Sequence, residues 1–324
     1  MNVSRIVSST VLIAGCCLIS TNSFAASCCG GGSATSLVLP KFSKAMVDFS
    51  FDYEKYDGFW NKQGDHTPDP PNSALKQYRL NAGYAHRLAS RWQASFNLPY
   101  VWNDNQYSGR SSETDGLGDS TINFWYESFD GIKCIWKVRK PKDLIPAAYF
   151  GTSITLPTGV SPYDDVDNSF DVTGRGFYRV DANMLLDKTI YPWNGTLLMS
   201  YGKHIDRSVN REYGNYVEPY KKSLGDRFQS TVSLGYTYFM ESMNTLTYTF
   251  AYSYLKEDKG KINGHDDPTS GFTKQSIAGT IAFATMDRDW VVKATWSHAL
   301  KDDNWGKNFP TTDIFSLGVS HVLR

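Results

Sequence analysis

Beyond its first 25 residues, the sequence has no long apolar run. A transmembrane helix needs roughly 18 or more consecutive, mostly apolar residues, and no such stretch occurs in residues 26–324. An excess of charge is missing too, because 33 basic side chains balance 33 acidic ones. A surface that binds nucleic acid needs a basic excess, so we expect no nucleic-acid partner.

Cysteine is also scarce, with five among 324 residues. Cys16 and Cys17 lie in an export signal, and Cys28, Cys29 and Cys134 are too few for a disulfide scaffold. Adjacent thiolates at Cys28 and Cys29 favour soft metals such as Cu(I) or zinc, although a structural zinc site has four ligands. A metal-binding hypothesis for Cys28 and Cys29 therefore stands beside the alternative that both are incidental in a flexible tail. We predict no cofactor.

The first 25 residues have the features of a signal peptide. Arg5 is the early positive charge, residues 6–19 are largely apolar, and Ser23-Phe24-Ala25 offers small residues before a cleavage site. We predict cleavage after Ala25. The residues that end at Cys16 also fit a lipoprotein signal, so lipidation of this cysteine remains an alternative. Either route exports the chain from the cytoplasm.

A Gly/Cys-rich N-terminal segment follows at 26–41, and from residue 42 to 324 apolar and polar residues alternate. In 227–238 and again in 245–254, one parity is mostly apolar or aromatic and the other is mostly Thr, Ser, Gln or Gly. Period two indicates β-strands. The runs are about ten residues long, as a tilted strand needs to cross a bilayer, whereas soluble strands average about five or six. Without helices, only a closed barrel satisfies its backbone in lipid.

Region 42–324 accommodates twelve such runs, joined by connections that alternate between long and short. We expect an all-β fold, an antiparallel transmembrane β-barrel of about 12 strands with long extracellular loops and short periplasmic turns. This barrel belongs in the outer membrane of a Gram-negative bacterium, and its even strand count places both termini on the periplasmic side. The connection at 130–146 is the exception among the turns, because it is longer and basic.

Aromatic residues gather near the ends of the expected strands, as the girdles of membrane barrels do. Simple cross-strand packing is the alternative explanation. The turn-side residues are Phe42, Trp92, Phe129, Trp193, Tyr238, Phe239 and Trp290, and the loop-side residues are Tyr53, Tyr100, Trp102, Tyr201, Tyr252 and Tyr254.

The alternation also directs eight charged side chains into the lumen, and we take them as pore-lining candidates. Mixed charge across a narrow lumen can set a transverse field and a constriction. Paired charges can equally well brace neighbouring strands and plug the barrel, and both interpretations remain open. The candidates are Asp48, Asp52, Arg79, Glu127, Arg179, Asp181, Asp187 and Lys293.

Three Gly-rich motifs resemble a known family. They are Gly116-Leu117-Gly118-Asp119, Leu156-Pro157-Thr158-Gly159 and Thr173-Gly174-Arg175-Gly176. Their order and spacing resemble the outer-membrane transporter family of the meta-pathway of phenol degradation, itself similar in style to outer-membrane fatty-acid transporters. The resemblance implies passage of small molecules, aromatic or apolar compounds among them, and supplies no catalytic residues. The Cys28-Cys29-Gly30-Gly31 opening looks like a feature of a subset of the family and puts phenol itself in doubt.

Together these features predict an outer-membrane channel or transporter for passive passage of small molecules, and no enzyme. Its expected partners are outer-membrane lipid, a small-molecule permeant and the barrel assembly machinery, although the chain lacks the usual terminal aromatic residue. One alternative is a barrel enzyme of the protease or lipase type with His265-Asp266-Asp267 and Asp164-Asp165 at its rim, but no G-x-S-x-G elbow is present. The other is a structural or adhesive barrel.

Overall fold

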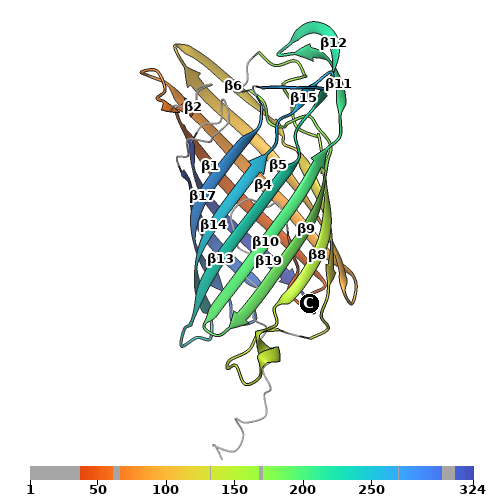
Figure 1. Cartoon of the computed structure of the whole chain (residues 1–324). Helices are drawn as coiled ribbons and strands as arrows, with labels where there is room; N and C mark the ends of the chain where they lie inside the picture. Colours follow the sequence, from red (N-terminus) through yellow and green to blue (C-terminus); the bar gives the residue numbers. More distant parts are fainter. Residues whose placement is uncertain (1–36, 61–65, 132, 168–170, 269, 301–310) are drawn as a thin grey trace, which may run out of the picture.

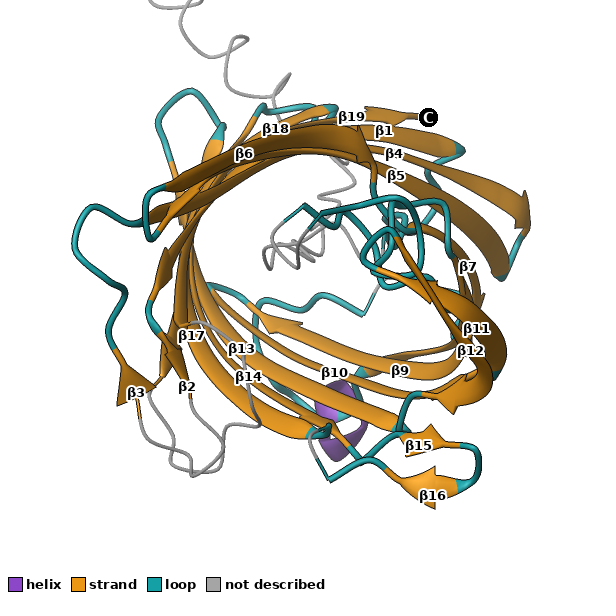
Figure 2. Ribbon diagram, turned by 90° about the horizontal axis from the view of Figure 1, so that it is seen from above, coloured by secondary structure: helices purple, strands orange, loops and turns teal. Residues whose placement is uncertain are grey.

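The computed structural model shows a single closed barrel of antiparallel strands (Figures 1 and 2). It describes residues 37–60, 66–131, 133–167, 171–268, 270–300 and 311–324. The predicted signal peptide, most of the Gly/Cys-rich segment, and Cys28 and Cys29 therefore lie outside the described residues. Within those residues, no helix is long and apolar enough to span a membrane.

Twelve strands form the barrel wall, and each pairs with the wall strands before and after it in the sequence; β4, for example, pairs with β1 and β5. The first and last wall strands, β1 and β19, also pair with each other and close the ring. The predicted strand number and architecture are confirmed. The wall strands are β1 (Ala45–Asp57), β4 (Ala74–Ala89), β5 (Trp92–Tyr107), β7 (Ser120–Glu127), β8 (Ala147–Leu156), β9 (Arg179–Ile190), β10 (Trp193–His204), β13 (Arg227–Phe239), β14 (Thr245–Glu257), β17 (Phe272–Ala284), β18 (Trp290–Leu300) and β19 (Thr311–Leu323).

The long connections carry short hairpins that stand above one end of the barrel (Figure 1) and add no strand to the wall. The carboxyl terminus lies at the opposite end, which is therefore the periplasmic end. A 3-10 helix, η1 (Pro141–Leu144), lies in the connection between β7 and β8 at this end. The hairpin strands are β2 (Phe59–Trp60), β3 (His66–Thr67), β6 (Arg110–Leu117), β11 (Arg207–Glu212), β12 (Asn215–Ser223), β15 (Lys261–Ile262) and β16 (His265–Asp266).

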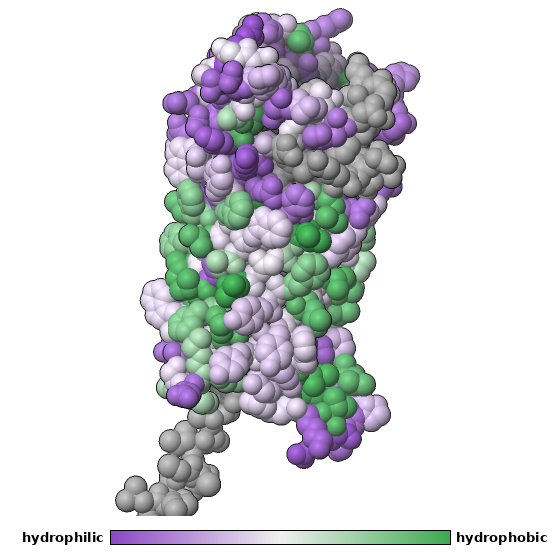
Figure 3. Space-filling view, turned by 90° about the vertical axis from the view of Figure 1, so that its left-hand side faces the viewer, coloured by the Kyte–Doolittle hydropathy of each residue, from purple (hydrophilic) through white to green (hydrophobic). Residues whose placement is uncertain are grey.

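The two faces of the wall are the reverse of a soluble protein. Large apolar side chains are exposed on the outside, Leu317 to 64% and Phe250 to 57%, whereas polar side chains such as Asn123 are buried inside. On the face shown in Figure 3, apolar side chains gather across the middle of the barrel, and hydrophilic side chains gather above them. Lipid therefore meets the outer face, and the chain is an outer-membrane barrel.

The predicted girdles hold in part. Trp92, Trp193, Tyr238 and Trp290 on the turn side are each about half exposed on the outer face, as lipid-facing rings should be. Phe129 differs, because it is 7% exposed and packs inside the barrel end against Tyr149 at a ring distance of 5.1 Å. Its position just past the end of β7 places it beyond the alternation of the strand.

One close approach inside the wall fixes the β7–β8 pair. A Cβ atom at Gly151 would lie 2.6 Å from Trp125 Cε3 and 2.7 Å from the Phe124 carbonyl oxygen. We expect Gly151→Val to destabilise the folded barrel by about 1–3 kcal/mol, because overpacking here displaces backbone as well as a ring. Urea unfolding in detergent micelles measures the effect. The control is Gly279→Val, since a Cβ at Gly279 meets no heavy atom within 4 Å; equal midpoints for the two variants would contradict the prediction.

Candidate functional site: the barrel lumen

Residues 37–41, which we call the N-terminal plug, lie inside the periplasmic end of the lumen. Leu37, Val38 and Leu39 are 7%, 4% and 0% exposed. Val38 packs against one side of the wall with Trp125 and Tyr149. A second cluster contains Leu37, Leu39, Met46, Ala85 and Val322. The clusters lie on β7, β8 and β9 and on β19, β1 and β4, so the plug packs against one half of the inner wall.

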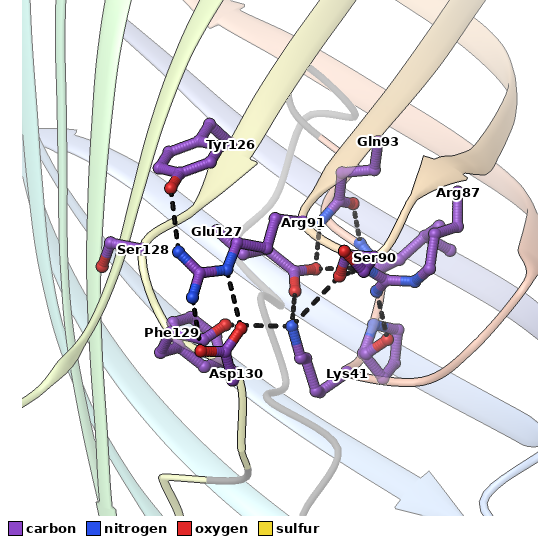
Figure 4. A network of polar contacts seen from close by, with 12 residues as sticks. Lys41, Arg87, Ser90, Arg91, Gln93, Tyr126, Glu127, Ser128, Phe129 and Asp130 are labelled. Atoms are coloured by element: carbon purple, nitrogen blue, oxygen red, sulfur yellow. Dashed lines mark hydrogen bonds and ion pairs between the residues drawn. The ribbon is translucent and has the colours of Figure 1, made fainter.

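Glu127, a predicted pore-lining residue, holds this plug in place (Figure 4). One carboxylate oxygen of this fully buried residue accepts from Lys41 Nζ at 2.5 Å, and the other accepts from Arg87 Nη1 at 2.7 Å and Gln93 Nε2 at 2.9 Å. Gln93 Oε1 in turn accepts the backbone N–H of Leu39 at 2.5 Å. Two cations and an amide therefore converge on one carboxylate from β4, β5 and the plug.

The backbone of the plug is bound as well as its side chains. Arg87 Nη2 donates to the Pro40 carbonyl at 3.0 Å, and Arg87 Nε donates to Ser43 at 2.8 Å. Lys41 Nζ also donates to the Phe129 carbonyl at 3.0 Å and lies 5.0 Å from the ring centroid of this residue. These contacts satisfy both charged groups in a site that excludes most solvent.

The sequence reasoning missed the apolar surface against which the plug packs. Trp125, Tyr149 and Leu185 point into the lumen and are 0%, 3% and 5% exposed. Their parity was a usable signal, because each sits between outward-facing residues on its strand. The contact with Val38 could not be foreseen, because the plug has no periodicity of its own.

The other predicted inward charges are paired within the barrel. Lys293 Nζ lies 3.2 Å from Asp48 Oδ2, and Arg179 Nε lies 2.8 Å from Asp181 Oδ1. Arg79 Nη1 lies 4.0 Å from Asp52 Oδ2. Asp48 and Lys293 come together because β19 lies between β1 and β18 in the ring.

Asp187 differs from the other candidates, because an amide satisfies its carboxylate. It accepts from Asn194 Nδ2 at 2.7 Å and is 7% exposed. Each of the eight candidates therefore forms an ion pair or a hydrogen bond with another side chain.

At the extracellular end, the three Gly-rich motifs meet around Asp119. Its two carboxylate oxygens accept the backbone N–H of Gly159 at 3.2 Å and that of Arg175 at 2.7 Å. A Cβ at Gly159 would lie 2.7 Å from the Cα of Gly174, so this approach requires glycine. The connection at 157–178 is thereby tied to the β6–β7 turn, and from above, loop segments lie within the ring of strands beside β7 (Figure 2).

The same connection places the guanidinium group of Arg175 against Glu257 on β14. Arg175 Nη1 and Nη2 donate to the two carboxylate oxygens of Glu257, at 2.6 and 2.7 Å. Glu257 ends β14 and is 5% exposed, whereas the Arg175 side chain is 36% exposed. The pair is bidentate, which adds geometric specificity to charge. It links the 157–178 connection, between β8 and β9, to β14, which lies beyond β10 and β13 in the ring.

Asp164 and His265, named as rim candidates for an enzyme, lie in separate surroundings. Asp164 accepts from the Ser161 backbone N–H and hydroxyl, both at 2.7 Å, and His265 stands exposed on β16 opposite Ile262. Within the described parts of the chain, no hydrogen bond joins His265 to Asp164, and no group of three His, Cys, Asp or Glu side chains could hold a metal. Cys134 is half-buried in the periplasmic connection.

Comparison with known proteins agrees with this geometry at the level of the fold. No family model matches the sequence, and no curated protein matches it. Among solved structures, the barrel is similar to an outer membrane channel from Pseudomonas putida F1, with a TM-score of 0.67 and 12% identity over 91% of this chain and 99% of that chain. The β domain of the Bordetella autotransporter BrkA gives a TM-score of 0.50 and 11% identity over 86% of this chain and 100% of that chain. Identities this low establish the outer-membrane barrel fold alone.

Proposed function

We propose that the chain is an outer-membrane channel for small molecules whose periplasmic end is closed by its own N-terminal plug. The observation that carries the proposal is the convergence of Lys41, Arg87 and Gln93 on the buried Glu127. A barrel built only for rigidity would have no need to bind its own leading segment by a separate set of ion pairs. A channel can use such a bound segment, because the segment can leave and thereby open the lumen.

The wall beneath the plug supports small permeants with an apolar part. If the plug leaves, Trp125, Tyr149 and Leu185 become lumen surface, beside polar groups such as Asn123 and Ser153. Aromatic and aliphatic walls with a few polar groups bind apolar or aromatic compounds. This surface agrees with the permeant class that the resemblance to the meta-pathway transporters implies. Membership of that family and of the Cys-Cys-Gly-Gly subset remains a prediction.

We further propose that the eight inward charges set the selectivity of the unplugged lumen. Asp48 with Lys293 and Arg179 with Asp181 place fixed charges of both signs on the inner wall, and fixed charges that line a pore select among permeants. The same pairs also brace neighbouring strands, and a single side chain can do both. The enzyme and adhesive alternatives gain no support from the arrangement of His265, Asp164 and their neighbours.

Single-channel conductance of the refolded mature chain in a planar bilayer tests the proposal. We expect removal of residues 26–41 to raise the conductance, because it empties the periplasmic end of the lumen. Removal of 26–36 alone is the matched control, since it leaves the plug residues in place and should conduct like the native chain. Equal conductance of the native chain and the two truncated chains would contradict the plug. No conductance in any of the three, once each is shown to be folded, would contradict the channel.

A further inference from the structure

The basic connection between β7 and β8 is a fixed part of the structure at the periplasmic end. We call its residues 133–146 the periplasmic foot. Ile135 forms a parallel bridge with Ile190 at the end of β9, where its N–H donates to the Thr189 carbonyl at 3.1 Å. The Trp136 ring lies 4.3 Å from the ring of Tyr191. These contacts fix the position of the foot relative to the end of β9.

The base and the tip of the foot are also closed by hydrogen bonds. Lys188 Nζ on β9 donates to the carbonyls of Lys133 and Ile145, both at 3.3 Å, which joins the two ends of the foot. At the tip, Asp143 Oδ2 accepts the backbone N–H groups of Arg139 at 2.8 Å and Lys140 at 2.9 Å. These two donors hold the pKa of Asp143 below its usual range, so this carboxylate stays charged at neutral pH.

Large apolar side chains on this fixed segment are nevertheless exposed, although the Trp136 ring also contacts Tyr191. Trp136 is 60% exposed, Leu144 55%, Ile145 53% and Val138 40%. A green patch above a purple edge marks the foot at the lower right of Figure 3. Apolar groups held rigidly in the open usually mark a contact surface. The patch lies beside the lipid-facing wall, because Trp136 contacts Tyr191, two residues before the half-exposed Trp193 at the start of β10.

The charge on the foot selects among the surfaces that could cover this patch. Its only acidic residue is Asp143, whereas the basic residues are Lys133, Lys137, Arg139, Lys140 and Lys142. Apolar side chains that include tryptophan, interleaved with lysine and arginine, are typical of segments that lie in a membrane interface. A polybasic segment beside a membrane is attracted to anionic lipid.

We propose that the periplasmic foot is an interfacial anchor: it inserts Trp136, Leu144 and Ile145 into the periplasmic leaflet of the outer membrane and binds anionic phospholipid head groups through its lysines and Arg139. The anchor fixes the rotation and depth of the barrel on the β8–β9 side. The inference is independent of the proposed channel, since it concerns the outside of the barrel.

Site-specific quenching of a fluorophore tests the anchor in the full mature chain. Cys28, Cys29 and Cys134 are replaced by serine, and a polarity-sensitive probe is attached through Leu144→Cys. The matched control is Tyr216→Cys in the extracellular β11–β12 hairpin, where the native side chain is 83% exposed. Both are refolded into vesicles of phosphatidylcholine, with or without phosphatidylglycerol. Because these vesicles have identical leaflets, the direction of insertion does not matter.

We expect spin-labelled lipid to quench the probe at 144 and aqueous iodide to quench the probe at 216. Phosphatidylglycerol should strengthen lipid quenching at 144 by roughly twofold or more, and raised salt should reverse this gain, since the attraction is electrostatic. Replacing Lys137, Arg139, Lys140 and Lys142 together with glutamine should abolish the dependence on anionic lipid while the barrel still folds. Iodide quenching at 144 equal to that at 216 would overturn the proposal. Protection of 144 only in native outer membranes would also overturn it, in favour of a protein partner.

Discussion

Replacing Glu127 with glutamine is expected to release the N-terminal plug from the lumen. The variant leaves Lys41 and Arg87, which are 8% and 13% exposed at their side chains, beside a neutral amide. Removing one partner of a buried ion pair typically costs about 3–5 kcal/mol, because the remaining charge stays desolvated. The plug can avoid this cost by leaving the lumen, where Lys41 regains water. The wall strands have no comparable escape.

Two measurements on the barrel in lipid detect the release of the plug. Single-channel conductance of Glu127→Gln should rise toward that of the chain without residues 26–41. A cysteine introduced by Leu37→Cys should change from protected to reactive toward a water-soluble maleimide, because the native Leu37 is 7% exposed; this variant also carries serine at the native cysteines.

The control for Glu127 is a neighbouring ion pair at the same barrel end. Arg91 and Asp130 are joined outside the buried cluster, and their side chains are 35% and 77% exposed. Arg91→Gln should change stability little, as removal of an exposed pair does, and should leave the plug protected. Native conductance together with native protection of position 37 in folded Glu127→Gln barrels would show that Glu127 does not retain the plug.

The wall of this barrel was predictable because one rule governs it from end to end. Lipid outside and polar groups inside impose period two on every strand, so the inward direction of Asp48 and Lys293 follows from parity alone. The pairing of these two residues does not follow from parity, because 245 positions separate them in the sequence. They meet only through the register of β1, β19 and β18. Register in a closed ring depends on all strands together, and no local pattern specifies it.

The two ends of the barrel were less predictable, because there the chain leaves the periodic wall. The Gly-rich motifs were visible as a signal, but their meeting point at Asp119 depends on how β7 and β8 align. The connections show the same limit: residues 103–117 are polar in sequence, yet they extend β5 and form β6 as a hairpin above the membrane. Polar composition does not distinguish a loop from an exposed hairpin, since neither face of such a hairpin needs apolar residues.

Replacing Asp119 with alanine is expected to free the 157–178 connection at the extracellular opening. The change removes two charge-assisted hydrogen bonds, to the backbone N–H groups of Gly159 and Arg175. Hydrogen bonds to charged groups contribute about 1.5–3 kcal/mol each, so the loss exceeds what a surface connection normally tolerates. Arg175 is then no longer positioned for its bidentate contact with Glu257. The wall strands remain paired, so we expect the barrel itself to fold.

Limited proteolysis and reversal potentials separate the two consequences of this change. Asp119→Ala should be cut within 157–178 faster than the native chain, whereas Arg175→Gln should keep the Asp119 contacts to the backbone and resist cutting. Arg175→Gln should shift the reversal potential in a salt gradient toward cations, measured without residues 26–41, because it removes the cation paired with Glu257. Asp119→Ala should give a smaller shift in the same direction, because it displaces Arg175 but also removes the Asp119 carboxylate. Asp115→Ala is the control, since the exposed Asp115 accepts from Tyr100 on the outer face. Native proteolysis and native selectivity in Asp119→Ala would mean that the connection is held by its other contacts, such as Thr173 Oγ1 with the Val160 N–H at 2.8 Å, and that the Gly-rich motifs serve the turn geometry alone.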